Sequence, residues 1–211
     1  MNQIGHHMPD ALLASYAAGN LPHPYALVVA AHISMCLTCR AGFEAHQAAG
    51  GAVLETSNAV AISGGLKSDV MALLDEPTVP APRFERSGIY PGPVVEALRG
   101  KAPRWRSLGL GVKQSILSGG SEGSVRLLYI PPGQAVPDHG HNGLELTLVL
   151  QGSFSDETGH YGVGDLEVAD QDLEHTPIAD GGDPCICLAA TDAPLRFTSL
   201  VPRILQPIFG I

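Results

Sequence analysis

The chain has 211 residues, of which 45% are hydrophobic, and carries a formal net charge of −9 at pH 7. This length allows two small domains or one large one with a buried core, and the negative charge argues against direct binding to nucleic acid phosphates. No apolar run approaches the length of a membrane span, and the first ten residues lack the basic start and apolar core of a signal peptide. We therefore expect a cytoplasmic protein whose partners offer basic surface.

The first third of the chain carries the signals of four helices. Asp10 can cap a helix that stops at Gly19, and Pro24 can start a second one. A third helix is expected after Cys39, and residues 66–75 predict a fourth. The sequence therefore predicts a small all-α unit at the N-terminus.

A metal-binding pattern lies between the second and third of these helices. His32, Cys36 and Cys39 follow the spacing H-x3-C-x2-C. His32 and Cys36 are four residues apart and share one helix face, while the two cysteines place two thiolates around one ion at the helix end. A closed tetrahedral zinc site needs a fourth ligand, for which His6 and His7 are the candidates.

Zinc would also stabilise so small a unit. A domain of about 75 residues seldom buries a sufficient core alone, whereas zinc can contribute on the order of 10 kcal/mol to folding. The alternative for the cysteine pair is redox chemistry of the thioredoxin type, which would need a βαβ context that this helical segment lacks. The pattern therefore favours a structural zinc site.

The middle of the chain reads as a linker. Six prolines fall between residues 77 and 103, a composition that neither a helix interior nor a central strand tolerates; they are Pro77, Pro80, Pro82, Pro91, Pro93 and Pro103. After them come short β-rich segments separated by Gly and Pro, a pattern that is typical of an all-β barrel or sandwich. We predict a division into residues 1–80, a linker over 81–101, and a β-domain over 102–211.

The β-rich half contains a second cluster of metal-ligating residue types. His139, His141 and Glu145 share odd numbering, so an extended backbone projects them to one face of a sheet. Residues 133–152 as a whole have the spacing G-x5-H-x-H-x3-E-x6-G, which resembles the first signature motif of the cupin superfamily. His175, after the next turn and strand, is the natural fourth ligand. The alternative to a metal site is a solvated His-Gly-His loop, with Glu145 as an ordinary charge on an edge strand.

The two halves together resemble a more specific family. Residues 6–21 and 28–40 are similar to the zinc-binding anti-sigma domain, and its union with a cupin-like domain that ends in residues 185–197 resembles the ChrR family over nearly the whole chain. The resemblance implies a small all-α zinc-binding N-terminal domain followed by an all-β cupin-like jelly-roll barrel. It favours His7 over His6, because the family's ligand histidine stands three residues before the aspartate that caps the helix. The implied ligands are His7, His32, Cys36 and Cys39 for one zinc, and His139, His141, Glu145 and His175 for a second zinc.

The resemblance also implies a function. Proteins of this family are cytoplasmic anti-sigma factors that hold an extracytoplasmic-function sigma factor inactive, with one of each expected per complex, and release it when singlet oxygen or related oxidants are sensed. An acidic chain suits a partner whose DNA-reading surfaces are basic. Two thiolates and two imidazoles leave no open position for catalysis, so no catalytic residue is expected.

An enzyme is the main alternative. Three histidines and a carboxylate are also the ligand set of cupin dioxygenases and isomerases, and they accept iron, manganese or nickel as well as zinc. The sequence identifies no substrate and no acid/base partner for such a reaction. A general ligand-binding module is the third possibility.

Three further residues are ambiguous. Cys185 and Cys187 face the same side of a predicted strand, either as oxidant targets or, as we prefer, as buried small hydrophobes. His160 could approach the cupin metal, although a solvated loop residue is the simpler interpretation.

Overall fold

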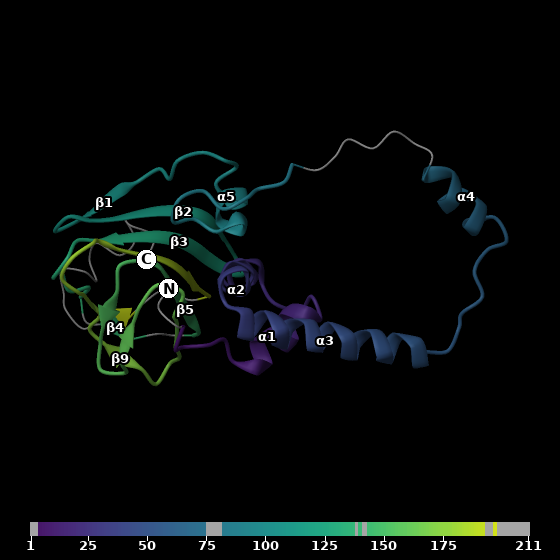
Figure 1. The fold of residues 1–211 in the computed structure, drawn as a ribbon, viewed down its shortest axis with the longest axis horizontal. Coiled ribbons are helices and arrows are strands. Elements are labelled where there is room, and N and C mark those ends of the chain that lie inside the picture. The colour runs from purple at the N-terminus through teal and green to yellow at the C-terminus, as the bar shows by residue number, and fades with distance from the viewer. Residues whose placement is uncertain (1–3, 75–81, 138, 141–142, 193–195, 198–211) are drawn as a thin grey trace.

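Helices lie beside a body of antiparallel β-sheets (Figure 1). The computed structural model describes residues 4–74, 82–137, 139–140, 143–192 and 196–197. The order of the two parts, helical first and β second, confirms the fold class predicted from the sequence.

Four helices form within the described residues 4–74, as predicted, although the third begins at Leu37 and not after Cys39. They are α1 (Asp10–Ala17), α2 (His23–Met35), α3 (Leu37–Thr56) and α4 (Leu66–Leu73). The capping role expected of Asp10 is wrong, because Pro9 takes the N-cap position and Asp10 is the first helical residue. Its carboxylate accepts a hydrogen bond from His46 Nε2 at 2.8 Å. The negative charge of Asp10 in the first turn still stabilises the helix through the helix dipole.

A single residue separates α2 from α3. Cys36 is extended, with φ −106° and ψ 112°, and ends one helix while capping the next through its sulfur, which accepts a bond from Cys39 N–H. The two helices bend by 117° at this point. Among the described residues, no single helix is long and apolar enough to cross a membrane, and α2 and α3 reach that length only as a bent pair.

Part of the predicted linker is helical. Residues 92–97 form α5 (Gly92–Ala97), which contradicts the expectation that proline excludes a helix here. Pro91 stands at the N-cap and Pro93 in the first turn, where the backbone N–H has no helical acceptor to lose. The fully buried side chain of Val94 fixes the helix, which packs against α2.

Within the described residues, the β-domain consists of one large sheet and two small ones. Its strands are β1 (Arg106–Gly109), β2 (Val112–Gly120), β3 (Gly123–Ile130), β4 (His139–Gly140), β5 (Glu145–Gln151), β6 (Phe154–Ser155), β7 (His160–Tyr161), β8 (Leu166–Ala169), β9 (Glu174–His175), β10 (Ile178–Ala179), β11 (Cys185–Thr191) and β12 (Arg196–Phe197). The large sheet has the order β1-β2-β3-β11-β5-β8, and the small ones are β10-β6-β7 and β12-β4-β9.

Strand alternation gives the large sheet two apolar faces. Leu146 and Leu148 of β5 join a core that also contains Val28 of α2, whereas Val149 and Cys187 face the opposite side with the short strands. Helix α2 packs on β3, β5 and β11. The helical part and the β-domain therefore share one hydrophobic core, and this core positions the candidate metal ligand of α2, His32, against the β-domain.

Candidate metal centres

The helical part gathers four metal-ligating side chains at the bend between α2 and α3. His7 comes from the segment before α1, His32 from the last turn of α2, Cys36 from the junction and Cys39 from the first turn of α3. One ligand atom from each lies within 4.8 Å of all the others. The other candidate from the sequence, His6, lies outside this cluster, and its ring packs on Tyr161 at 4.4 Å between centroids.

The distances within this cluster fit a tetrahedral ion. His32 Nε2 lies 3.2 Å from Cys39 Sγ, and His7 Nδ1 lies 3.3 Å from Cys36 Sγ and 3.6 Å from Cys39 Sγ. Nitrogen and sulfur ligands at zinc bond lengths are about 3.5 Å apart at the corners of a tetrahedron. The residues present therefore fit the zinc site that the sequence pattern predicts.

The protonation chemistry of this cluster also points to a cation. Burial and the neighbouring His7 lower the pKa of His32 to about 4. Burial and the adjacent Cys36 raise the pKa of Cys39 to about 11, against the opposing bond from Met8 N–H. A divalent cation at this cluster would convert the thiols to ligating thiolates.

A second group of metal-ligating residue types lies inside the β-domain. His175 Nδ1 is 2.7 Å from Asp156 Oδ2 and 3.1 Å from Glu167 Oε1. None of the three side chains is more than 4% exposed. Sequence reasoning predicted His175 and missed both carboxylates. Asp156 precedes a turn and Glu167 lies within an otherwise apolar strand, so only the fold brings them to His175.

The charges of this group are coupled. Burial raises the pKa of Glu167 to about 7. Burial by itself lowers the pKa of His175, but Glu167 and Asp156 outweigh it and raise the value to about 9. Burial likewise opposes ionisation of Asp156, yet bonds with Glu167, Thr158 and His175 hold its pKa below the ordinary range. The result is an ionised Asp156 that holds a proton on His175 Nδ1.

The cupin ligands predicted from the sequence are described only in part. His139 of β4 pairs through its backbone with His175 of β9, so two of the predicted ligand positions lie side by side. Glu145 begins β5, accepts a hydrogen bond from Thr147 at 3.0 Å, and its charge helps to raise the pKa of His175. His141 lies outside the described residues.

The remaining candidates fall outside both groups. Cys185 and Cys187 are buried, with their sulfur atoms 3.4 Å apart, and the bond to Cys185 together with burial raises the pKa of Cys187. Such thiols behave as small hydrophobes. His160 is exposed and pairs with Asp180 at 3.0 Å.

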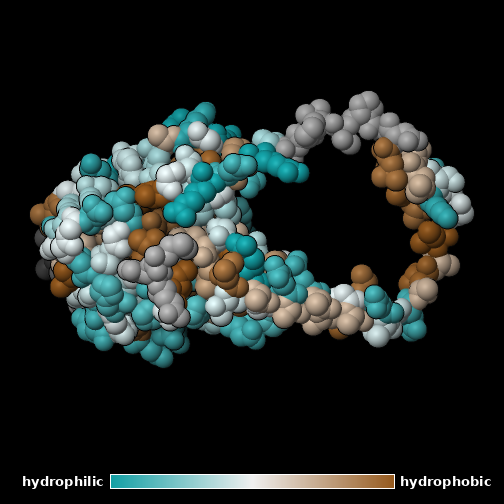
Figure 2. All heavy atoms as spheres, in the orientation of Figure 1, coloured by the Kyte–Doolittle hydropathy of each residue, from teal (hydrophilic) through white to brown (hydrophobic). Residues whose placement is uncertain are grey.

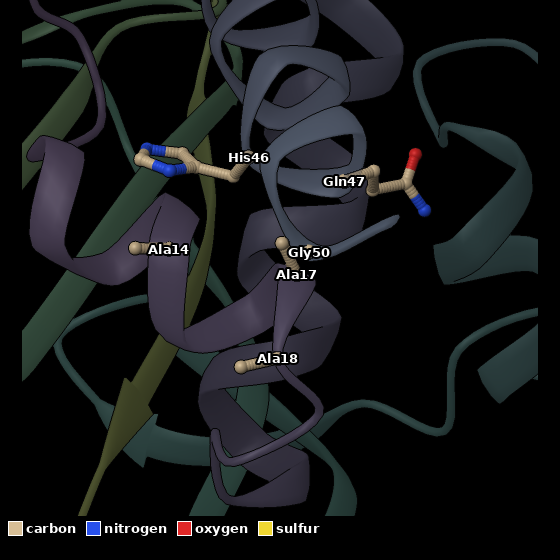
Figure 3. A pocket seen from close by; sticks show the side chains of 6 residues that line it. All are labelled: Ala14, Ala17, Ala18, His46, Gln47 and Gly50. Carbon is tan, nitrogen blue, oxygen red and sulfur yellow. The ribbon is translucent and has the colours of Figure 1, made fainter. Parts of the chain in front are cut away.

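A small hollow lies between α1 and α3 (Figure 3). Its volume is about 310 Å³, and its lining consists mainly of small residues: Ala14, Ala17, Ala18, His46, Gln47 and Gly50. Two polar side chains, those of His46 and Gln47, complete its lining.

Comparison with known proteins covers both halves of the chain. The family described as the ChrR cupin-like domain matches residues 96–193. The anti-sigma-E factor ChrR of Cereibacter sphaeroides is 54% identical over 211 residues, which is 99% of each chain. The crystal structure of Rhodobacter sphaeroides SigE in complex with the anti-sigma ChrR contains a chain with 53% identity and a TM-score of 0.81, covering 90% of this chain and 100% of that one.

Proposed function

Since the chain belongs to the ChrR family, we propose that it is an anti-sigma factor that sequesters an extracytoplasmic-function sigma factor in the cytoplasm. The complex would contain one copy of each protein, and it would release the sigma factor in response to singlet oxygen or related oxidants. The chain would act as a regulator, with no catalytic residues and no direct contact to nucleic acid or membrane.

The observation that carries this proposal is an exposed apolar stretch from the end of α3 through α4. Leu54 is 75% exposed and Val60 is 84% exposed, and α4 has no buried residue at all. Figure 2 shows hydrophobic residues gathered along this arm, away from the body of the molecule. The exposed members are Val53, Leu54, Val60, Ile62, Leu66, Val70, Met71, Leu73 and Leu74. So much exposed apolar surface marks an interaction site.

The charge of the chain supports a sigma factor as the occupant of this arm. A net charge of −9 complements the basic surfaces with which a sigma factor reads DNA. The hollow between α1 and α3 offers a second place for an apolar anchor. Covering those basic surfaces would prevent the sigma factor from reading its promoter.

The N-terminal site has a structural role in this account. His7, His32, Cys36 and Cys39 would hold one zinc ion, and zinc would supply rigid tetrahedral coordination with no open position. These residues tie the start of the chain to the α2–α3 bend, and so set the direction in which α3 leads toward α4. The predicted domain division at residues 1–80, 81–101 and 102–211 would separate sigma binding from sensing.

The β-domain would be the sensing part. We propose that His139, His141, Glu145 and His175 hold one zinc or another divalent metal, with Asp156 and Glu167 behind His175. Oxidant chemistry near these residues would alter the β-domain and weaken the inhibitory complex. The alternative of a cupin enzyme has no comparable support, because the chain resembles a named anti-sigma factor along its whole length.

Co-purification tests the proposal. The full chain, expressed at its native level with an affinity tag, should bring down one extracytoplasmic-function sigma factor in stoichiometric amount. A chain that runs alone and turns over a small molecule would instead support the enzyme.

A further inference from the structure

One turn of the β-domain lies directly against the N-terminal metal centre. This 162–166 turn joins β7 to β8 and contacts the segment that carries His7. Asp165 Oδ1 accepts hydrogen bonds from Gly5 N–H at 2.7 Å and from His6 N–H at 2.9 Å. The Leu166 N–H in turn donates to the His6 carbonyl at 3.2 Å. The two residues just before a metal ligand are thus held by the β-domain.

Apolar packing reinforces these hydrogen bonds. Gly164 has a positive φ of 92°, and a Cβ atom at this position would come within 2.6 Å of Ile4 Cδ1. The turn therefore needs glycine both for its backbone conformation and for the close approach of Ile4. On the other side of the segment, the His6 ring packs on Tyr161. The segment before His7 is fixed by backbone, apolar and ring contacts together.

The same turn reaches the end of α2, the helix that carries a second metal ligand. His32 Nδ1 is buried and, within the described residues, forms no hydrogen bond of good geometry. A Cβ atom at Gly164 would lie 3.8 Å from Cε of Met35, which ends the helix that carries His32. His32 Nε2, the nitrogen beside Cys39, is the candidate ligating atom.

The turn is also connected to the proposed sensing site. Strand β8 pairs with β5 so that Leu166 lies opposite Leu148 and Ala169 lies opposite Glu145. One four-residue strand therefore joins a predicted cupin ligand to the turn. A second contact runs in parallel, because the Tyr25 hydroxyl of α2 donates to the Leu144 carbonyl at 2.6 Å, next to Glu145.

We propose that the 162–166 turn is the outer shell of the N-terminal metal centre, so that the β-domain determines how firmly the helical part retains its metal. Asp165 and Gly164 act as positioning residues for His7. This inference rests on the proposed zinc site and adds the route by which the β-domain can affect it. Loosening the turn frees His7, opens the tetrahedral shell and releases the constraint on α3.

The test compares metal release from the full chain in three single variants. Asp165→Ala removes the acceptor for three backbone donors, those of Gly5, His6 and Gly162. Ile4→Ala removes the apolar contact with Gly164. Asp170→Ala is the matched control, because Asp170 caps a different turn of the β-domain through Asp172 N–H. Cobalt replaces zinc, since cobalt–thiolate absorption reports only on the site that contains Cys36 and Cys39.

We expect the cobalt–thiolate absorption to decay about tenfold faster after addition of excess chelator in Asp165→Ala and Ile4→Ala, and at the wild-type rate in Asp170→Ala. In the double variant that combines Ile4→Ala with Asp165→Ala, the absorption should decay hardly faster than in Asp165→Ala alone, because both changes release the same segment.

Wild-type decay rates in both Asp165→Ala and Ile4→Ala would overturn the inference. If Asp165→Ala does not fold, Ile4→Ala decides the matter, because it leaves every side-chain hydrogen bond of the turn in place. The measurement needs no sigma factor, so a failure of the proposed function would appear separately, as a wild-type chain that binds no sigma factor.

Discussion

Cys36 combines two structural roles with its place in the metal centre. Its extended backbone ends α2 and turns the chain by 117° into α3, and its sulfur accepts the Cys39 N–H bond that caps α3. The same sulfur lies 3.3 Å from His7 Nδ1. A change at this residue therefore affects the bend, the cap and the coordination shell.

Replacing Cys36 by serine separates these roles. Serine is a good N-cap, so the start of α3 should survive, while the thiolate ligand is lost. We expect the zinc content to fall by one ion per chain and helical circular dichroism to melt at a lower temperature. Cys187→Ala, a buried thiol in the β-domain, is the control and should keep all its zinc. Unchanged zinc content in Cys36→Ser would contradict the assigned ligand set.

The Asp156 carboxylate should matter to the metal that we propose for the β-domain. Its 2.7 Å contact with His175 Nδ1 fixes the proton there, which directs Nε2 to the metal. Asp156→Asn should weaken metal binding in the β-domain by about 10- to 100-fold, with cobalt–thiolate absorption unchanged. Equilibrium titration against a competing chelator measures this affinity, with Asp170→Asn as the control. Equal affinities would show that the carboxylate does not support the ligand.

Ligand spacing was predictable from the sequence, but the residues behind the ligands were not. His32, Cys36 and Cys39 lie close together along the chain, so their spacing marks them as one cluster, although a bend between two helices, and not one helix face, brings them together. Asp165 and Glu167 reach their partners only because β8 folds beside β5 and against the N-terminal segment. No local pattern marks either residue.

At the scale of elements, α4 differs from every other helix because none of its residues is buried. Its apolar side chains gain nothing from folding of the chain alone, so their use must come from a partner. The sequence predicted this helix from residues 66–75, and its exposure emerges only from the fold.

A charge in α4 should therefore affect binding and leave folding unchanged. Val70 and Met71 are 49% and 54% exposed. Changing both to aspartate should weaken the sigma complex by at least tenfold, because buried apolar anchors dominate interfaces. The melting temperature of the free chain should stay the same. Ile116→Asp, at a 47% exposed position of β2, is the matched control. Isothermal titration that finds equal affinities would exclude α4 from the interface.

Helix α5 shows where proline counting fails. The prediction treated the prolines between residues 77 and 103 as helix breakers, yet Pro91 and Pro93 occupy positions that suit the start of a helix. Position within the helix, not number, decides the effect of proline.

At the scale of the whole molecule, the helical part and the β-domain meet in one core. Val28 and Tyr25 of α2 pack with residues of the large sheet such as Leu127 and Leu188. Each half could be predicted separately, because helix and strand periodicities are local. The packing between them could not, since the apolar face of α2 satisfies the pattern of a self-contained helical bundle equally well.

Variants at two predicted metal ligands, Glu145 and His141, test the sensing role of the β-domain. Glu145→Ala or His141→Ala should remove a metal ligand while leaving α3 and α4 untouched, so repression should persist and induction should be blunted. Sigma-dependent transcription in illuminated cells with a photosensitiser measures both. Full induction in both variants, with metal shown to be lost from the β-domain, would reject metal-centred sensing.

The most direct test of the central claim is transcription in vitro. The extracytoplasmic-function sigma factor that co-purifies with the chain is combined with purified core RNA polymerase, and the holoenzyme initiates at a promoter of that sigma factor. The account predicts that an equimolar amount of the zinc-loaded chain, added to the sigma factor before the core enzyme, abolishes the transcript, and that Cys36→Ser does not. Undiminished transcription in the presence of the wild-type, zinc-loaded chain would contradict it.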